Sequence, residues 1–402
     1  MQVTLIGLSG GTGETLTPEA RLALERAELV LGAARLLQAL PRIEKQERAA
    51  ATRAAELFER LTRSDAARPC VVFSGDTGFY SGASGLAPLL REAGIGYRVL
   101  PGLSSVQLLA ARLGEPWQDW TLCTAHGADC DPVAALMAGR PAFFLTGGRH
   151  TPDSLCRAIT DAGLGALRVA VGENLACPEE RVTAMTAVAC AQRRFAPLSV
   201  LWVAAAPRPV ERAGGIPDAA FLRGEVPMTK QEVRAAILAK LAVRPDDTVW
   251  DIGAGTGSVS VELALAARRG SAYAVEYRDE ALALIEANRT RFGAWNLRVV
   301  RGRAPEALAA LPAPDAVFIG GSGGRLREIA EAALSKNPEA RLCVSAIALE
   351  TLAAGLEVFQ ALGLEAEITQ LSVSRAKPGG RLHLLLANNP VFLVTACREA
   401  DR

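Results

Sequence analysis

Several features that mark common functional classes are missing from this sequence. The eight cysteines form no C-x-x-C pair, which disfavours metal sites and disulfide frameworks and indicates a reducing compartment. The formal net charge is only +1, so the chain lacks the charge of a nucleic-acid-binding protein. The longest apolar-looking stretch, residues 382–397, contains His383, Asn388, Asn389 and Pro390, which disfavour a membrane span. We therefore expect no metal, nucleic acid or membrane among the partners.

The length of the chain and a segment rich in proline and glycine indicate more than one domain. A chain of 402 residues is too long for one ordinary core. Residues 207–217 contain prolines and glycines that fit neither a helical nor a strand period. We expect a first domain at 1–206, a linker at 207–214 and a second domain at 215–402. The first apolar run, residues 3–6, follows no basic segment, so we expect no secretory signal and a cytoplasmic location.

The second domain opens its sheet with a strand, a glycine turn and a helix. Residues 248–252 are strand-like, and the turn that follows lacks side chains at three positions, which lets a ligand approach the backbone and the start of the next helix. A second apolar run, residues 272–275, ends at Glu276, whose carboxylate can accept both hydroxyls of a ribose. This α/β pattern predicts a nucleotide site formed by Gly253, Ala254, Gly255, Thr256, Gly257 and Glu276.

The spacing of the turn favours one nucleotide ligand over another. A dinucleotide site has the pattern G-x-G-x-x-G, whereas this turn is G-x-G-x-G and follows Asp251 directly. An acidic side chain disfavours a pyrophosphate and suits the ammonium of S-adenosylmethionine (SAM). We therefore predict SAM, with an NAD-linked oxidoreductase as the alternative and a purely connecting turn as the simplest explanation.

Three apolar runs of the first domain each end in a loop of small residues. The loops are residues 7–13, 74–78 and 101–105, and such loops meet at the ligand crevice of an open α/β sheet. Together these loops resemble the three motifs of the tetrapyrrole (corrin and porphyrin) methylase family. The matching segments are Ile6 to Thr17, S-G-D-T-G-F at 74–79 and P-G-L-S-S at 101–105.

This resemblance implies a two-lobed class III methylase fold with SAM folded between the lobes. The lobes would cover about 1–115 and 116–206, with the break near Glu115. The SAM contacts that the resemblance implies are Gly75, Asp76, Ser104, Ser105, Leu145 and Thr146. Ser9 and Gly10 depart from the family pattern, which leaves their roles open, and Asp76 alone would fit a turn cap equally well. His126, beside Gly127, is more typical of a structural residue than of a catalyst.

The second domain carries its own family resemblance. Its motifs at 227–234, 251–259, 304–308 and 318–324 resemble the decarboxylating precorrin methyltransferases, which are class I SAM enzymes with a Rossmann-like fold. The resemblance places SAM among Thr229, the glycine turn, Glu276 and Ala304. Thr229 with Glu232 also fits a capping box at a helix start. Arg303 stands where class I enzymes often have an acidic residue beside the adenine.

Taken together, the two resemblances imply a bifunctional enzyme of cobalamin biosynthesis with two SAM sites per chain. The implied reaction is methylation of precorrin-6Y at C5 by the first domain and at C15 by the second, with loss of carbon dioxide from the ring C acetate. For the second domain we expect a substrate-binding loop of Gly320, Gly321, Ser322, Gly323 and Gly324. Lys230 and Arg234, one helical turn apart, are the candidate catalytic residues for steering the departing carboxylate. We also expect a homo-oligomer, and a non-catalytic first domain remains an alternative.

Overall fold

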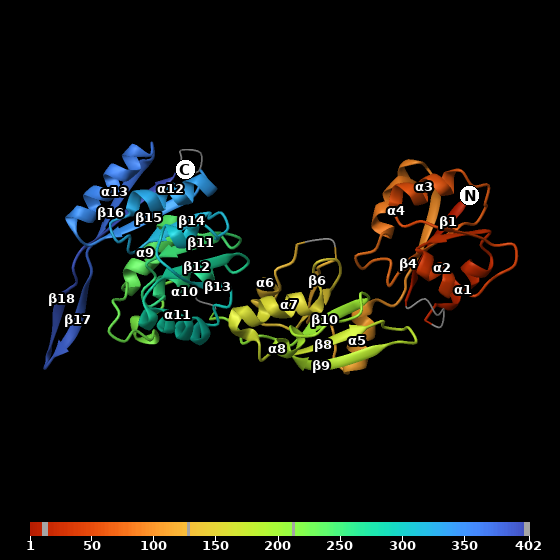
Figure 1. Ribbon diagram of the computed structural model, residues 1–402, viewed down its shortest axis with the longest axis horizontal. Coiled ribbons are helices and arrows are strands. Elements are labelled where there is room, and N and C mark those ends of the chain that lie inside the picture. The colour runs from red at the N-terminus through yellow and green to blue at the C-terminus, as the bar shows by residue number, and fades with distance from the viewer. Residues whose placement is uncertain (10–14, 127–128, 211–213, 398–402) are drawn as a thin grey trace. The chain divides into compact units, whose positions relative to one another are not determined.

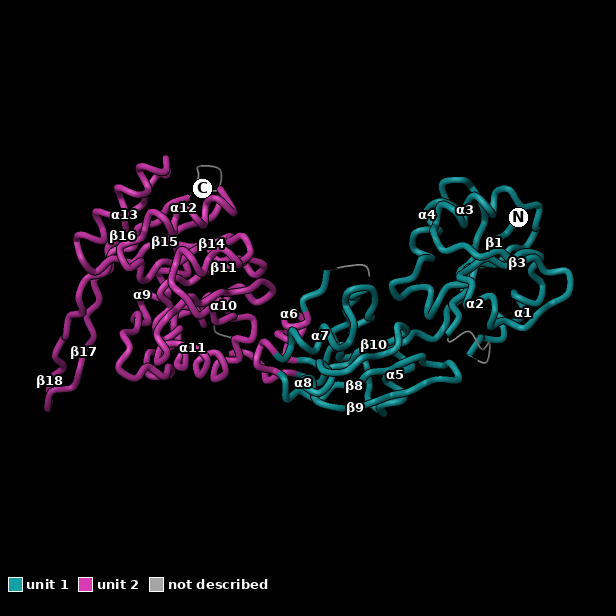
Figure 2. Tube along the Cα trace, in the orientation of Figure 1, with its two compact units in different colours: residues 1–131, 140–160, 165–205 teal, residues 132–139, 161–164, 206–402 magenta. Residues whose placement is uncertain are grey.

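The computed structural model describes residues 1–9, 15–126, 129–210 and 214–397, so Gly10 and Gly127 lie outside the described residues. Figure 1 shows the order of the elements along the chain. The chain forms two compact units, which Figure 2 distinguishes by colour. Unit 1 contains residues 1–131, 140–160 and 165–205, and unit 2 contains 132–139, 161–164 and 206–402.

Unit 1 begins with a five-stranded parallel sheet in the order β3-β2-β4-β1-β5. Its strands are β1 (Gln2–Leu8), β2 (Leu29–Gly32), β3 (Glu47–Ala50), β4 (Cys70–Ser74) and β5 (Gly96–Leu100). Its helices are α1 (Pro18–Glu25), α2 (Ala34–Ala39), α3 (Ala54–Thr62) and α4 (Ala83–Glu92). Neighbouring residues of β1 point to opposite faces of the sheet. Ile6 packs in the core formed with α1 and α2, and Leu5 packs in the core formed with α3 and α4. Both faces of the sheet are therefore covered, as a parallel sheet requires.

A second, mixed sheet of unit 1 has the order β6-β7-β10-β8-β9. Its strands are β6 (Thr121–Thr124), β7 (Ala142–Leu145), β8 (Arg168–Glu173), β9 (Arg181–Thr186) and β10 (Ser199–Val203). Helices α5 (Ser105–Leu113), α7 (Pro152–Ile159) and α8 (Ala187–Cys190) accompany it. Val106 and Leu109 of α5 pack with Phe143 and Trp202 of this sheet. The second core thus starts at α5, before the lobe break expected near Glu115, because the apolar face of α5 needs a sheet to cover it.

Unit 2 contains a seven-stranded sheet in the order β13-β12-β11-β14-β15-β19-β16, parallel up to β15 and antiparallel beyond it. Its strands are β11 (Thr248–Ile252), β12 (Ser271–Glu276), β13 (Leu297–Arg301), β14 (Ala316–Ile319), β15 (Arg341–Ala346), β16 (Glu365–Leu371) and β19 (Val391–Cys397). Its helices are α9 (Gln231–Leu241), α10 (Ser258–Ala266), α11 (Asp279–Phe292), α12 (Leu326–Lys336) and α13 (Leu349–Ala361). This topology confirms the predicted Rossmann-like α/β class for the second half.

The remaining elements of the chain are short. They are α6 (Pro132–Leu136), a π-helical turn (Thr160–Leu164), two 3₁₀ turns (Asp218–Ala220 and Glu306–Leu308) and the separate hairpin β17 (Ser374–Gly379) with β18 (Leu382–Ala387). Within the described residues no helix is long and apolar enough to cross a membrane.

Candidate functional site

The three predicted loops of unit 1 contact one another through the backbone of Gly7, Gly75 and Gly102. A Cβ on Gly7 would lie 2.5 Å from the carbonyl oxygen of Gly75 and 2.6 Å from the nitrogen of Gly102. These loops follow β1, β4 and β5, which are neighbours in the sheet. The close approach is possible only without side chains, so glycine at these positions brings the three loops to one point at the carboxyl ends of the strands.

The polar side chains of these loops mainly hold the loops themselves. Asp76 Oδ1 accepts a hydrogen bond from the Gly78 nitrogen at 2.8 Å, and Oδ2 accepts one from the Gly102 nitrogen at 3.1 Å. Ser104 caps α5 in a capping box with Gln107. The Thr146 hydroxyl donates to the Ser199 carbonyl at 2.6 Å. Asp76 therefore caps its own turn, which was one of the two roles considered from the sequence. It also joins the loop after β4 to the loop after β5.

All the residues predicted to contact a cofactor in unit 1 line one cavity of about 330 Å³. They are Gly75, Asp76, Ser104, Ser105, Leu145 and Thr146. The same cavity is lined by Arg35, Tyr80 and His126. His126 lies directly against Gly147, where a Cβ would be 2.0 Å from its Nδ1.

Arg35 and Tyr80 were missed from sequence, although each stands a few residues beyond the end of a strand. Arg35 follows β2 and Tyr80 follows β4. A search of every strand-end loop for large polar or aromatic side chains would have found both, because such loops line the crevice of an α/β sheet.

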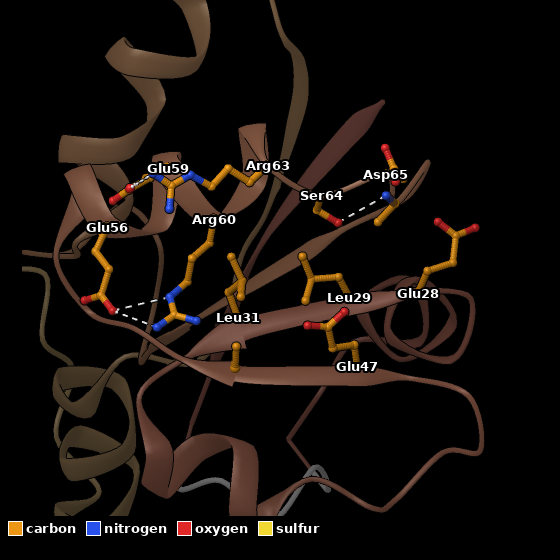
Figure 3. Close-up of a pocket in the computed structure, with 12 residues that line it drawn as sticks. Glu28, Leu29, Leu31, Glu47, Glu56, Glu59, Arg60, Arg63, Ser64 and Asp65 are labelled. Atoms are coloured by element: carbon orange, nitrogen blue, oxygen red, sulfur yellow. Dashed lines mark hydrogen bonds and ion pairs between the residues drawn. The ribbon is translucent and has the colours of Figure 1, made fainter.

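A larger cavity of unit 1, about 870 Å³, lies elsewhere (Figure 3). It is lined by Glu28 and Glu47 at the amino ends of β2 and β3 and by α3, where Arg60 pairs with Glu56 and Arg63 with Glu59. The glycine loops are at the opposite, carboxyl ends of the strands. Exposed pairs of this kind are solvated surface charges, so we leave this cavity out of the candidate site.

In unit 2 the glycine turn after β11 packs against the loop after β14. A Cβ on Gly253 would lie 2.8 Å from the Gly321 carbonyl oxygen, and one on Gly255 would lie 3.4 Å from the Pro227 carbonyl oxygen. Gly253 and Gly255 have φ values of 74° and 56°, which glycine adopts readily. The strand order reverses at β11, and such a switch point is where open α/β sheets bind their ligands.

Glu276 is buried at the end of β12 and is held by backbone. Its carboxylate accepts hydrogen bonds from the nitrogens of Gly255 at 3.0 Å, Tyr277 at 2.9 Å and Arg278 at 3.1 Å. A carboxylate offers about four acceptor positions, so capacity remains for a ribose hydroxyl. The orientation of Glu276 is fixed before any ligand arrives.

Asp251 is 1% exposed, and its Oδ2 accepts a hydrogen bond from the Ser260 hydroxyl. Among the described residues its Oδ1 and the Thr256 hydroxyl have no hydrogen-bond partner. Burial, aided by the charge of Glu276, raises the pKa of Asp251 to about 7. Buried polar atoms without partners are costly, and an ammonium group of a ligand would satisfy the Asp251 oxygen. The end of β11 and the turn after it thus keep two buried polar atoms without partners among the described residues, one of them a carboxylate oxygen.

A cavity of about 170 Å³ adjoins this turn. The residues predicted to bind SAM or substrate that line this cavity are Gly253, Glu276, Ala304, Gly321, Ser322 and Gly323. Tyr277, Arg303 and Arg325 also line it, and the Arg303 guanidinium stacks over the Tyr277 ring at 4.0 Å. Thr229, Ala254, Gly255, Thr256, Gly257, Gly320 and Gly324 lie outside this lining. Tyr277 was missed, although its place directly after Glu276 was a usable signal.

The predicted role of Arg234 needs correction. Its side chain is 0% exposed, and its Nε donates to Glu262 at 2.9 Å while Nη1 donates to Asp218 at 2.8 Å. Glu262 also accepts from the nitrogens of Gly215 and Ile216 at 3.0 Å each. Because this network surrounds the guanidinium, Arg234 holds the 215–218 segment and is removed from the candidate catalytic residues.

The expected capping box is also wrong. Lys230 is the N-cap of α9, which has no side-chain cap bond in the described part of the chain. Arg375 explains the difference, because it pairs with Glu232 at 2.6 Å and with Asp218 at 2.9 Å. Lys230 itself is half-buried at the start of the helix.

The expected backbone nest at 320–324 is shorter than the sequence suggested. The nitrogens of Gly320 and Gly321 donate to the Ile252 carbonyl at 2.9 and 3.2 Å, which extends the pairing of β14 with β11. These two bonds use the first two nitrogens of the loop, so only those of Ser322, Gly323 and Gly324 remain for a ligand.

Two family models match successive parts of the chain. A model of the tetrapyrrole (corrin/porphyrin) methylases matches residues 2–189, and a model of the precorrin methyltransferase domain matches residues 219–398. The "Probable cobalt-precorrin-6B C(15)-methyltransferase (decarboxylating)" of Pyrobaculum calidifontis is 46% identical over 45% of this chain and 95% of its own length. A crystal structure of a precorrin-6Y C5,15-methyltransferase from Geobacter metallireducens is 37% identical, with a TM-score of 0.45, and covers 46% of this chain and 100% of its own.

One relative spans nearly the whole chain. The precorrin-6Y C(5,15)-methyltransferase [decarboxylating] of a Sinorhizobium species is 35% identical over 94% of this chain and 92% of its own length. The match covers both glycine-loop sites in their order along the sequence. The chain belongs to the family of bifunctional, decarboxylating precorrin-6Y C5,15-methyltransferases.

Proposed function

We propose that this enzyme uses SAM to methylate precorrin-6Y at C5 and C15 and removes the carboxyl group of the ring C acetate as carbon dioxide, giving precorrin-8x. The observation that carries the proposal is a separate glycine-lined cavity in each unit. Each unit therefore has its own candidate SAM site, with two sites per chain. The NAD-linked oxidoreductase is not supported, because the unpartnered buried oxygen of Asp251 suits an ammonium and repels a pyrophosphate.

In unit 2, SAM would supply its methyl group as a sulfonium. Glu276 would accept the ribose hydroxyls, Ala304 would line the pocket, and Asp251 would face the ammonium. Thr256, also predicted as a SAM contact, lies outside that lining. A corrin precursor has enamine-like carbons that are already nucleophilic, so the main task of the protein is to align the carbon with the sulfonium. We propose that Lys230 steers the acetate carboxylate that leaves as carbon dioxide and that the loop 322–324 holds a neighbouring carboxylate.

In unit 1, the six predicted residues around the larger glycine-loop cavity would hold the other SAM for methylation at C5. We assign C5 to residues 1–206 and C15 with decarboxylation to residues 215–402, joined by the linker 207–214. The supporting observation is Lys230, half-buried at the start of α9. It stands three residues after Pro227, whose carbonyl oxygen lies 3.4 Å from where a Cβ on Gly255 would be, so a lysine there could hold the acetate next to the carbon that is methylated.

Mass spectrometry of the products from precorrin-6Y tests this assignment in the intact chain. We expect Glu276→Ala to give a product that gains one methyl and keeps every carboxylate. We expect Asp76→Ala to slow the first methylation while methylation with loss of carbon dioxide continues. Calorimetry should count two SAM sites in the unchanged protein. A single site, or carbon dioxide release by the Glu276→Ala chain, would overturn the assignment.

We also propose a cytoplasmic homo-oligomer in which the β17–β18 hairpin is covered by a second copy of the chain. The hairpin extends away from the main sheet of unit 2 (Figure 1) and forms a two-stranded sheet of its own. Leu382, Leu384 and Leu385 are 68%, 56% and 74% exposed. A lone hairpin is only marginally stable in water, and apolar edges invite pairing.

Light scattering tests this interface. Leu385→Asp should lower the measured mass, whereas Leu349→Asp, on a residue of α13 that is 69% exposed, should leave it unchanged. A monomeric unchanged protein would contradict the proposal.

A further inference from the structure

Tyr80 has a backbone conformation that a large aromatic residue rarely adopts. Its φ is +47°, in the left-handed region where a Cβ crowds the backbone. It follows the turn in which Asp76 accepts from the Gly78 nitrogen. Residues held in this region persist only when their surroundings impose it, and they gather at functional sites. A glycine or asparagine would fit this backbone better, so the tyrosine ring needs another explanation.

The tyrosine ring is not explained by burial. Tyr80 is 54% exposed, although it lines the cavity that contains Asp76, Ser104 and Thr146. Its ring meets Phe79 edge to face with the centroids 4.8 Å apart, and its hydroxyl donates a long hydrogen bond of 3.4 Å to the Leu122 carbonyl. These contacts hold the ring at the cavity while about half of the residue stays open. An exposed, oriented aromatic face at a cavity is a surface on which a flat ligand can stack.

A cationic group lines the same cavity. Arg35 is exposed in α2, and its Nη2 donates to the Ser74 hydroxyl at 2.7 Å. A guanidinium has five donors in a planar fork, so most of its capacity remains for a ligand. Its charge suits a carboxylate. The cavity thus offers a flat apolar face and a carboxylate-binding fork on residues that follow two different strands.

We propose that Tyr80 and Arg35 form the substrate-binding rim of unit 1. The ring of Tyr80 stacks on the face of a tetrapyrrole macrocycle, and Arg35 pairs with one of its peripheral carboxylates. This pair fits the proposed substrate, because a tetrapyrrole precursor combines the face of a large ring with many peripheral carboxylates. The inference rests on the proposed C5 methylation and adds the residues that bind the substrate separately from the cofactor.

Two substitutions of Tyr80 separate stacking from packing. Tyr80→Asn suits the left-handed backbone but removes the ring, so we expect the KM for precorrin-6Y in C5 methylation to rise roughly tenfold. Tyr80→Phe keeps the ring and should stay within about twofold of the unchanged enzyme, because stacking does not use the hydroxyl. Both variants should keep the SAM dissociation constant and the unfolding temperature.

Arg35 has a matched control in the same unit. Arg35→Gln should raise the same KM about tenfold and make it less dependent on salt, since a charge-assisted hydrogen bond is lost. Arg63→Gln, in the cavity at the amino ends of the strands (Figure 3), should change neither quantity.

The outcomes distinguish this inference from the function on which it rests. If the unchanged enzyme forms no C5-methylated product, the proposed function fails. If that product forms and Tyr80→Asn leaves the KM unchanged, the rim proposal is wrong. Equal losses of SAM and substrate affinity would assign the two residues to the cofactor instead, and a lowered unfolding temperature with an unchanged KM would assign the ring to packing.

Discussion

The two units build similar sites from glycine loops but use their acidic residues in different ways. In unit 1, both oxygens of Asp76 accept backbone N–H groups, from Gly78 and Gly102. In unit 2, Glu276 is likewise held by backbone, but Asp251 keeps one buried oxygen that finds no partner among residues the structure describes. The acid of the first site is satisfied by backbone, whereas the second site keeps a buried carboxylate oxygen without a partner among the described residues.

This difference predicts how strongly each unit depends on its cofactor. A buried oxygen without a partner costs free energy of folding, and a ligand that supplies the missing donor recovers it. A ligand that binds only the folded state also raises stability by mass action. Cofactor binding should therefore stabilise unit 2 more than unit 1. Four substitutions test the comparison.

The largest effect is expected from Gly102→Ala in unit 1. The new Cβ would lie 2.5 Å from the Gly7 carbonyl carbon and 2.7 Å from the Gly75 oxygen, so the three loops must separate. We expect loss of SAM binding in unit 1, and a destabilisation of about 1 to 3 kcal/mol or more, in calorimetry and urea unfolding. Gly96→Ala, at the other end of β5 with nothing near its Cβ, is the control. Retained binding in Gly102→Ala would show that the loops are not held by this contact.

Much of this arrangement could be predicted from the sequence, because the signals are local. Glycine spacing and apolar runs located the loops after β1, β4, β5 and β11, and parallel strands bring such loops together. The start of α1 is local in the same way, because Thr17 is its N-cap and Pro18 its first residue, and the Thr17 hydroxyl oxygen accepts from the Ala20 nitrogen at 3.2 Å.

What the sequence could not provide is the pairing of charges across long separations. Arg234 reads as a solvent-facing helix residue until Glu262 and Asp218 are seen to bury it. Glu232 reads as a helix cap until Arg375, far along the chain, takes its carboxylate. Neither partner lies within reach of a helical or strand period, so no local pattern identifies it.

The second prediction concerns the acid that unit 2 holds by backbone. Glu276→Ala removes the proposed ribose acceptor and leaves three backbone nitrogens without their hydrogen bonds. SAM affinity in unit 2 should fall about a hundredfold, since hydrogen bonds to a charged group are lost. Calorimetry of the full chain should still detect the unit 1 site at its original affinity. A loss at both sites would mean that the two units do not bind independently.

The third prediction uses the protonation of Asp251. Burial raises its pKa from 3.8 to about 7, so the folded state holds this proton more tightly than the unfolded state does. Stability of the ligand-free chain should therefore fall as pH rises from about 4 to about 7 through this group. Under the proposed pairing of Asp251 with the SAM ammonium, protonation removes the carboxylate, so SAM affinity in unit 2 should drop roughly tenfold for each pH unit below about 7.

Asp251→Asn provides the test, because it removes the titration while nearly keeping the shape. The contributions of Asp251 to the pH dependence of stability and to that of SAM affinity should both disappear, and SAM should bind unit 2 weakly at every pH. Asp246→Asn, at an exposed pair with Arg269, serves as the control. If SAM affinity in the unchanged protein is the same at pH 6 and pH 8, Asp251 does not face the ammonium.

The smallest effect is expected from Asp76→Asn in unit 1. The side-chain oxygen of asparagine can keep one of the two backbone bonds, but its NH2 group would face the other N–H and lose it. The link between the loops weakens without breaking, because the glycine contacts remain, and SAM affinity should fall only about threefold to tenfold. If Asp76 acts by joining loops, stability measured in urea should fall together with affinity. If affinity drops more than a hundredfold with stability unchanged, Asp76 binds the cofactor directly, and the contrast between the two units disappears.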